Sequence, residues 1–354
     1  MKLYYPKDHY DSSHRRHLFP LLKPFLKPEA FTDKERIDIY GVSENDFKFS
    51  EDINDADVAI LTMSWWYYKI TDKVKIAIDF IKETNKLNLP VLVLVPSDNG
   101  MDIPKDLDAI VVRAQGYKSK LNSQHFAMPV FISDPLKTYY NTTEISERSF
   151  EIKPVIGFCG QANKSKVEAL KDLVKTSIKN ILYYLKVRWQ TPHALMAPKF
   201  LRATLVYKML KDTRVNSNFI IRKKYRAGIN ANDKKNTHKT TLEFFDNILN
   251  SDYVLCVRGA GNFSVRLYET LAMGRIPIFV NTDCMLPLSD TFAWKGHVVW
   301  VEYNERNQIV EKVLLYHSKL NESELNNQFK KNRELWETKL QLKPYFKELL
   351  NSIY

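Results

Sequence analysis

The sequence SDYVLCVRGAGNFSVRLYETLAMGRIPIFVNTDCMLPL (Ser251–Leu288) decides the fold. Tyr253–Val257 is an apolar run of strand length, a turn with two glycines follows it, and Ser264 is a candidate helix N-cap. Apolar residues then recur at helical spacing up to Gly274, and Ile276–Val280 is a second apolar run. The stretch predicts two parallel strands joined by a helix in a right-handed crossover.

The turn of this unit favours an anionic ligand. Gly259 and Gly261 let backbone N–H groups approach a ligand closely, and a helix N-terminus adds about half a positive charge. Arg258 in the turn and Arg266 in the first helical turn can both direct guanidinium groups at a phosphate. We therefore expect a phosphate-containing ligand at this turn.

Glu269 lies three residues beyond Arg266, on the same side of the predicted helix. A carboxylate disfavours phosphate, but it can accept hydrogen bonds from two ribose hydroxyls. The alternative is an ordinary ion pair between Glu269 and Arg266 on a solvated helix. The glycine turn and the two arginines favour nucleotide binding, with Glu269 on the ribose.

A set of residues in and after this stretch resembles a known family. The set is Cys256, Arg258, Gly259, Ser264, Arg266, Leu267, Glu269, Ala272, Gly274, Ile276–Ile278 and Leu286–Pro287. At these positions the chain resembles the exostosin-type glycosyltransferases, glycosyltransferase family 47, in a bacterial form. The resemblance continues weakly through Trp294 and Val298–Val301. One departure is Val257, where the family often has proline.

The resemblance implies the GT-B architecture, an α/β fold with two Rossmann-like domains that face a central cleft. We expect an N-terminal acceptor domain at residues 1–145 and a C-terminal nucleotide-sugar donor domain at residues 146–335. The resemblance also implies that a C-terminal helix at residues 336–354 packs back on the N-terminal domain. Turn residues and charges between Ser133 and Pro154 interrupt the apolar periodicity and support the boundary.

The rest of the chain alternates between strand-like and helix-like segments, which is typical of a parallel α/β sheet. The predicted strands are Lys2–Tyr5, Ile37–Tyr40, Val58–Thr62, Val91–Val95, Ala109–Val112, Val155–Cys159, Phe219–Ile221 and His297–Val301. The predicted helices are Leu18–Leu26, Val74–Lys86, residues 166–211, Ile309–Lys319, Ser323–Leu340 and Pro344–Ile353.

Ligands of parallel sheets bind beyond the carboxyl ends of the strands, so the loops there are candidate sites. The loop after the first strand carries the candidate catalytic bases Asp8, His9 and Asp11, and also His14. The alternative for this loop is a polar surface turn with a serine as helix N-cap.

Two further loops are candidates for the acceptor sugar. Trp65, Trp66 and Tyr67 follow the third predicted strand and are candidate acceptor-binding residues, because aromatic rings stack on the apolar faces of sugars. Core packing is the alternative for these rings. Asp98 and Asn99 follow the fourth predicted strand and could bind sugar hydroxyls or only form a turn.

The predicted donor site gathers residues from two strand ends. Arg222 follows Phe219–Ile221 and is a further candidate for the donor phosphates, with a solvated loop as the alternative. The predicted diphosphate-binding residues are Arg258, Gly259, Gly261, Ser264, Arg266 and Arg222, and Glu269 is the predicted ribose-binding residue.

The charge of the chain is unevenly distributed. The net charge is +12, but residues 1–150 carry 20 basic and 22 acidic side chains, so the excess of basic residues lies entirely in the second half. A basic surface attracts nucleotide sugars, nucleic acids or anionic membranes. No nucleic-acid-binding signature accompanies it, so we expect no nucleic acid partner.

Other features of the sequence bear on location and cofactors. The three cysteines are far apart, and we find no apolar stretch of membrane-spanning length and no signal-peptide pattern. We expect a cytoplasmic protein with peripheral contact to the inner face of a membrane. The Asp-x-Asp pattern occurs at Asp55–Asp57 and Asp106–Asp108 but nowhere in the predicted donor domain, so we expect no metal and no other cofactor.

These observations together predict an inverting, metal-independent glycosyltransferase, either a hexosyl- or a pentosyltransferase. It would move a sugar from a nucleoside-diphosphate sugar, UDP-sugar first and GDP-sugar second, to a hydroxyl of a glycan or lipid-linked glycan acceptor in surface polysaccharide synthesis. The alternatives are a non-catalytic basic scaffold for acidic polysaccharide or nucleic acid, and an epimerase or phosphorylase with the same fold.

Overall fold

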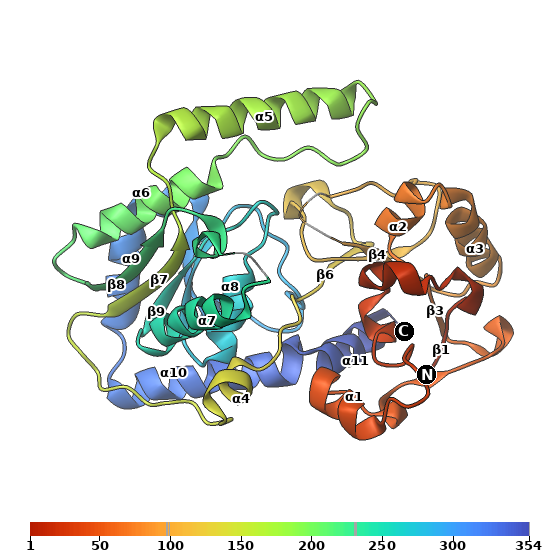
Figure 1. Ribbon diagram of the computed structural model, residues 1–354, viewed down its shortest axis with the longest axis horizontal. Coiled ribbons are helices and arrows are strands. Elements are labelled where there is room, and N and C mark those ends of the chain that lie inside the picture. The colour runs from red at the N-terminus through yellow and green to blue at the C-terminus, as the bar shows by residue number, and fades with distance from the viewer. Residues whose placement is uncertain (97, 99, 230–231, 354) are drawn as a thin grey trace.

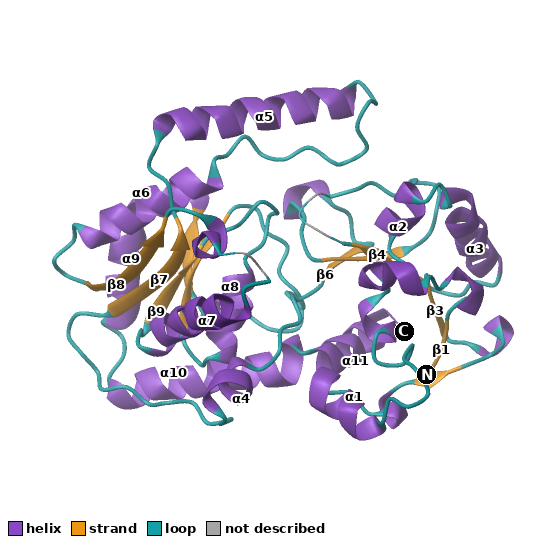
Figure 2. Cartoon of the chain, in the orientation of Figure 1, coloured by secondary structure: helices purple, strands orange, loops and turns teal. Residues whose placement is uncertain are grey.

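The computed structural model describes residues 1–96, 98, 100–229 and 232–353. This part of the chain contains two parallel β-sheets, one of six and one of five strands, each covered by helices (Figures 1 and 2). The predicted fold class, α/β with two Rossmann-like domains in the GT-B arrangement, is confirmed.

The first sheet has the strand order β2-β1-β3-β4-β5-β6. Its strands are β1 (Lys2–Tyr4), β2 (Lys48–Phe49), β3 (Val58–Ile60), β4 (Val91–Val95), β5 (Ile110–Arg113) and β6 (His125–Ala127). Its helices are α1 (Asp33–Tyr40), α2 (Trp65–Ile70) and α3 (Val74–Lys86). Every residue of β4 is buried, as a continuous apolar run predicts for an inner strand of a parallel sheet.

Short 3-10 turns connect these elements. They are η1 (Lys7–His9), η2 (Ser12–His17), η3 (Pro20–Leu22), η4 (Glu44–Asp46), η5 (Ile53–Asp55) and η6 (Lys118–Lys120). The predicted helix Leu18–Leu26 is wrong in length, because only η3 forms there. Pro20 and Pro24 bracket this turn, and each lacks the backbone N–H that an α-helix requires.

The predicted strand Ile37–Tyr40 is also wrong, because these residues form the second half of α1. Thr32 and Glu35 make a reciprocal capping box at the helix start, and Gly41 ends the helix with a φ of 66°. Local capping therefore determines the structure here, although Ile37, Ile39 and Tyr40 are residues that favour strands. Strands β2 and β6 were not predicted, because they are short.

The second sheet has the order β11-β10-β9-β7-β8. Its strands are β7 (Val155–Gln161), β8 (Asn216–Arg222), β9 (Tyr253–Cys256), β10 (Ile276–Asn281) and β11 (Val299–Glu302). Strands β9 and β10 pair in parallel, and α8 (Val265–Ala272) connects them, so the unit predicted from the central stretch is confirmed.

The remaining helices surround the second sheet or extend beyond it. They are α4 (Pro135–Tyr140), α5 (Lys166–Tyr184), α6 (Pro198–Leu210), α7 (Lys234–Leu249), α9 (Ile309–His317), α10 (Glu322–Leu335) and α11 (Leu342–Ile353). The short turns are η7 (Tyr225–Gly228), η8 (Trp294–Gly296), η9 (Tyr303–Gln308) and the π-helical η10 (Trp336–Leu340). Residues 185–197, predicted as helix, instead separate α5 from α6.

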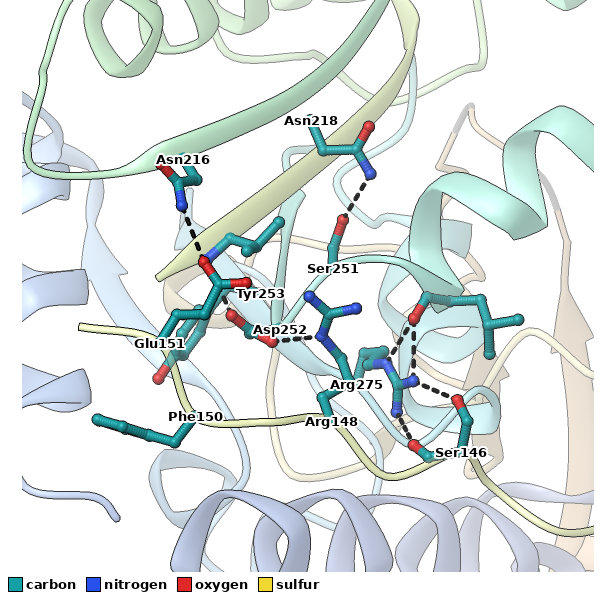
Figure 3. Close-up of polar contacts among 12 residues, drawn as sticks. Ser146, Arg148, Phe150, Glu151, Asn216, Asn218, Ser251, Asp252, Tyr253 and Arg275 are labelled. Carbon is teal, nitrogen blue, oxygen red and sulfur yellow. Dashed lines mark hydrogen bonds and ion pairs between the residues drawn. The ribbon is translucent and has the colours of Figure 1, made fainter. Parts of the chain in front are cut away.

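The segment that joins the two sheets is held on the second domain (Figure 3). The Arg148 Nε donates to the Asp252 carboxylate at 2.6 Å, and the other oxygen of Asp252 accepts from the Val155 N–H at 2.8 Å. The buried Arg275 donates to both the carbonyl and the hydroxyl of Ser146, at 3.0 and 2.7 Å. These bonds fix the path of the chain into β7.

Helix α4 also packs on the second domain, although the predicted division assigns it to the first. Leu136 lies in a buried cluster with Cys256 and Met273. Arg333 of α10 makes two hydrogen bonds, of 2.9 and 2.6 Å, to the carboxylate of Asp134, the N-cap residue of α4. The boundary at residue 145 itself stays a prediction.

Helix α11 packs in the core of the first domain. Its buried residues Tyr345, Phe346 and Leu349 belong to the same hydrophobic cluster as strands β3 and β4. The Tyr345 hydroxyl donates to the Ala127 carbonyl at the end of β6, at 2.9 Å. The chain therefore returns to the first domain after completing the second (Figure 1).

We expect Phe346→Ala to lower the free energy of unfolding by about 3–5 kcal/mol, because it leaves a cavity in the first core. Phe346 is fully buried and contacts the rings of Phe19 and Phe131. Urea unfolding followed by circular dichroism measures the change. Leu315→Ala on α9 is the control, since Leu315 is exposed, and a loss as large in the control would contradict the packing of α11.

Candidate active site

The carboxyl ends of the two sheets face each other. The Asn262 side chain, after β9, donates to the Gly116 carbonyl, after β5, at 2.9 Å. The Ser119 hydroxyl donates to the Asp283 carboxylate, after β10, at 2.6 Å. Since ligands of parallel sheets bind beyond the carboxyl ends of the strands, the candidate site lies where these two edges meet.

Asn262 holds the glycine turn in place. It is fully buried, and its Nδ2 lies 2.9 to 3.0 Å from the carbonyls of Gly116, Thr282 and Asp283. Its Oδ1 accepts from the Thr282 hydroxyl at 2.6 Å. No local sequence pattern predicts this role, because two of these partners follow β10 and the third lies in the other domain.

Arg258 is buried in the turn and points toward the first domain. Its Nη1 donates to the Tyr117 hydroxyl at 2.9 Å, and the guanidinium lies over the Tyr117 ring. Its Nη2 donates to the Ala260 carbonyl at 3.1 Å. The structure gives it no carboxylate partner among the described residues, so its positive charge is not neutralised by an ion pair.

Arg266 lies beneath the ends of β7 and β9. Its Nη2 donates to the Cys159 carbonyl at 2.7 Å, and its Nη1 donates to the Leu255 carbonyl at 3.3 Å. The guanidinium also stacks on Phe158, 4.7 Å from the ring centroid. Like Arg258, it donates only to neutral acceptors, and among the described residues it has no carboxylate within ion-pair distance.

The two glycines of the turn have different surroundings. Nothing lies within 4 Å of the position that a Cβ on Gly259 would occupy, so the space beside this residue is open. A Cβ on Gly261 would lie 2.9 Å from the Asp98 carboxylate and closer still to the Phe263 ring. Gly261 is therefore needed for close packing with the first domain. Asn99 lies outside the described residues.

Ser264 is the N-cap residue of α8, and its side chain makes no capping hydrogen bond. The first N–H groups of α8 thus have no side-chain acceptor from Ser264, and the positive end of the helix dipole lies in the site.

Arg222 lies at the end of β8, directly opposite Gln161 at the end of β7. Its Nη2 donates to the Glu243 carboxylate at 2.6 Å and to the Thr240 carbonyl at 2.8 Å. Unlike Arg258 and Arg266, it is already paired with a carboxylate.

Glu269 is half-buried on α8, and the structure records neither a hydrogen bond nor an ion pair to its carboxylate among the described residues. Burial raises the pKa of Glu269 to about 7, and the charge of Arg266 opposes this rise only in part. The alternative of an ordinary ion pair on a solvated helix is therefore wrong. A carboxyl group held this way can accept ligand hydroxyls.

Two residues that no sequence pattern singles out carry pKa values influenced by the arginines of the site. His193 lies between α5 and α6, and burial, with the charge of Arg258, lowers its pKa to about 4. Arg202 lies on α6, where burial lowers its pKa to about 10 and Arg266 adds a repulsive charge. Residues 185–197 form neither a helix nor a named strand, and the predicted helix over residues 166–211 gave no reason to single out His193.

Buried polar atoms without partners gather around this site. Arg222, Arg258 and Arg266 each keep a buried Nε without a hydrogen-bond partner, and so does the Nδ1 of His193. An unpaired buried polar group costs free energy, which a ligand can recover. Because the unpaired donors belong mostly to arginines, an anionic ligand would suit this site.

The candidate catalytic residues of the first loop differ in their surroundings. Asp11 accepts hydrogen bonds from the Ser13 hydroxyl and N–H, the Tyr67 hydroxyl and His14 Nδ1, at 2.5 to 3.0 Å. These bonds, that from the Ser13 hydroxyl above all, hold the pKa of Asp11 well below its usual range. Asp11 is thus a weak base that orients His14.

The other two candidate bases are His9, which is partly buried, and Asp8, which is exposed. His9 contacts the Tyr68 hydroxyl through Nδ1 at 2.9 Å, and burial lowers its pKa. Asp8 is exposed on η1.

The predicted acceptor-binding aromatics separate into two groups. Trp65 and Tyr67 are buried in the first core, so the alternative of core packing holds for both, and neither ring offers a face to a sugar. Trp66 is only half-buried and packs against Trp189, with ring centroids 4.5 Å apart. Trp66 alone of the three stays a candidate for the acceptor.

Comparisons with known proteins add little to this geometry. No family model matches the sequence, and no curated protein matches it. Among solved structures, a point mutant of S. aureus TarM in complex with fondaparinux, alpha-GlcNAc-glycerol and UDP matches with 11% identity and a TM-score of 0.37. The match covers 83% of this chain and 54% of that one, so it spans about half of TarM. A likeness at this level carries no argument about function.

We expect Glu269→Gln to remove a pH dependence of stability. The pKa of Glu269 is about 7 in the native protein, against an ordinary value of 4.5. Between pH 4.5 and pH 7 the native protein therefore keeps a proton on Glu269 that the unfolded protein has released. Rising pH therefore destabilises the wild type over this window, and the loss is complete above pH 7. At pH 8 the free energy of unfolding of the variant should be higher than that of the wild type by about 1–3 kcal/mol. At pH 4 the two values should be equal.

The comparison uses urea unfolding at both pH values without ligand. Glu334→Gln on α10 is the control, since Glu334 is exposed. Equal shifts in the two variants would contradict the assigned environment of Glu269.

Proposed function

We propose that this chain is a glycosyltransferase that takes a nucleoside-diphosphate sugar and transfers the sugar to a hydroxyl of a glycan. One observation carries the proposal: Arg258 in the glycine turn, Arg266 on α8 and Arg222 at the end of β8 each keep a buried nitrogen without a partner, at the edge of the second sheet that faces the first. A diphosphate placed there meets positive charge and unpaired donors, and an acceptor held by the first domain would face it.

In this proposal Arg258, Arg266 and the N-terminus of α8 stabilise the departing diphosphate. Transition-state charge develops on the leaving oxygen, and preorganised donors stabilise it at no cost of reorganisation. The open space beside Gly259 admits the phosphates close to the backbone. Glu269 accepts the ribose hydroxyls, and Arg222 contributes after exchanging its bond to Glu243.

The general base of this proposal is His14, oriented by Asp11. The His14 Nδ1 lies 2.9 Å from the Asp11 carboxylate, which leaves Nε2 to take the proton of the acceptor hydroxyl. The acceptor oxygen then bonds to the anomeric carbon as the bond from that carbon to the diphosphate breaks. A single displacement of this kind inverts the anomeric centre, and the arginines replace the charge that a metal would supply.

The donor nucleotide, the pathway, the alternative base and the acceptor contact are proposed from the sequence. UDP is the first donor nucleotide to test and GDP the second, and the pathway is surface polysaccharide synthesis in the cytoplasm. Asp8 is the alternative base, and Trp66 is the acceptor contact. Among the described residues no three His, Cys, Asp or Glu side chains gather as metal ligands would.

We expect Gly259→Val to abolish UDP binding while the protein stays folded, because the side chain fills the space that the phosphates need. A ligand at about a hundred times its dissociation constant adds roughly 2.7 kcal/mol of stability, so a thermal shift detects binding. Gly296→Val is the matched control, because nothing lies within 4 Å of a Cβ there either.

The binding measurement includes GDP and a chelator. Binding unaffected by chelator supports the metal-independent reaction. Equal UDP binding by wild type and Gly259→Val would place the nucleotide elsewhere. Binding of neither nucleotide, with salt-sensitive binding of heparin instead, would favour the basic scaffold.

We expect His14→Gln to lower the turnover of a UDP-sugar by about 10²–10⁴-fold while UDP binding stays unchanged, because the variant cannot take the acceptor proton. Asp11→Asn should lower turnover less and shift its pH profile, since Asp11 acts through His14. Asp8→Asn is the control with normal turnover. Loss in Asp8→Asn alone would move the role of the base to Asp8.

A further inference from the structure

Helix α5 carries an apolar stripe that faces away from the protein. Six apolar residues recur along it at spacings of three and four, which places them on one side of a helix. They are Val167, Leu170, Val174, Ile178, Ile181 and Leu185. Their side chains are exposed, from 51% for Val174 to 66% for Leu185, so nothing in the described chain covers the stripe.

The opposite side of α5 is the one that faces the rest of the molecule. Ala169, Leu173, Thr176 and Asn180 lie there and are partly buried. In Figure 1 the helix runs along the outer edge of the molecule, above the second domain and toward the first. Surface helices of globular proteins normally turn their apolar side inward, so this orientation is reversed.

Basic residues border the stripe. Lys171, Lys175 and Lys179 recur every four residues beside it; Lys171 and Lys175 are exposed, and Lys179 is partly buried. The acidic residues of α5 are Glu168, which is paired with Lys171 at 2.8 Å, and Asp172, which is paired with Lys199 at 3.6 Å. Lys175 and Lys179 have no acidic partner among the described residues. The exposed side of α5 is thus apolar along its centre and positive along its border.

We propose that α5 docks in the headgroup region of an anionic lipid bilayer, with the apolar stripe inserted and the lysine row on lipid phosphates. A helix with an apolar side and a lysine-rich border lies in the plane of a membrane surface. Charge complementarity selects this occupant, because Lys175 and Lys179 have no acidic partner among the described residues, and α5 has no row of acidic residues that could pair with them in a second copy. Among the described helices none has the length and apolar character needed to cross a bilayer.

The docked helix would bring the candidate site close to the membrane. Residues 185–197 follow α5, and Trp189 in this segment packs on Trp66 of the first domain. His193 of the same segment reaches the surroundings of Arg258. The segment therefore links the docking helix to both sheets, but the docking itself does not depend on the proposed reaction.

Cosedimentation with vesicles tests the proposal. The full chain is mixed with phosphatidylcholine vesicles with and without phosphatidylglycerol, at low and high salt. We expect the wild type to bind only the vesicles that contain phosphatidylglycerol, and less at high salt. Val174→Glu with Ile178→Glu should weaken binding at least about tenfold, and Lys175→Ala with Lys179→Ala should weaken it by a similar factor.

The control is Ile37→Glu with Ile39→Glu, a pair of equally exposed isoleucines on α1. It should bind like the wild type, and circular dichroism checks that each variant is folded. No binding of the wild type, or equal loss in the control pair, would overturn the proposal. So would light scattering that shows a wild-type dimer and a monomeric Val174→Glu, Ile178→Glu variant, because a second copy would then cover the stripe.

Discussion

The hydrogen bonds of one buried amide, that of Asn262, determine the geometry of the candidate site. Its Nδ2 lies within hydrogen-bond distance of carbonyls from both domains, and its Oδ1 is bonded to Thr282. A buried amide satisfied in this way specifies one arrangement, because every alternative leaves polar groups unpaired. The glycine turn, and with it Arg258, is therefore positioned by β10 and by the first domain together. Neither domain alone contains the site.

The arginines of this protein belong to two chemical classes. Arg148 and Arg333 are bonded to the carboxylates of Asp252 and Asp134, so their charges are neutralised and they act as structural ties. Arg258 and Arg266 are bonded only to carbonyl and hydroxyl oxygens, which fix the guanidinium without cancelling its charge. Desolvated positive charge is costly unless an anion compensates for it. This difference separates the candidate site from the rest of the basic surface.

Much of the fold could be predicted from local pattern. The runs Val91–Val95 and Tyr253–Val257 are apolar throughout; the first forms β4, and Tyr253–Cys256 of the second forms β9, both of them buried inner strands. The strand predicted at Ile37–Tyr40 is wrong, because the capping box at Thr32 stabilises a helix there and outweighs the β-propensity of a few residues. The direction in which α5 turns its apolar side is a property of packing, so periodicity indicates that the stripe exists but not which way it faces.

The candidate site was only partly predictable for a similar reason. Arg258, Arg266 and Glu269 lie on one short unit, so their spacing alone brings them together. Tyr117 and His193 join them from distant parts of the chain, through contacts that no local motif encodes. The burial of Trp65 could not be known either, because a run of aromatic residues is compatible with both a core and a binding surface.

The return of α11 to the first domain has a consequence for biosynthesis. Leu342, Phe346 and Leu350 complete a core whose other members leave the ribosome much earlier. Domains made first generally fold first, but here the nascent N-terminal sheet lacks part of its apolar cover until the second domain has been made. The order of maturation is therefore reversed: the C-terminal sheet can close on its own residues, and the N-terminal sheet closes last, when translation of the helix that covers it is finished.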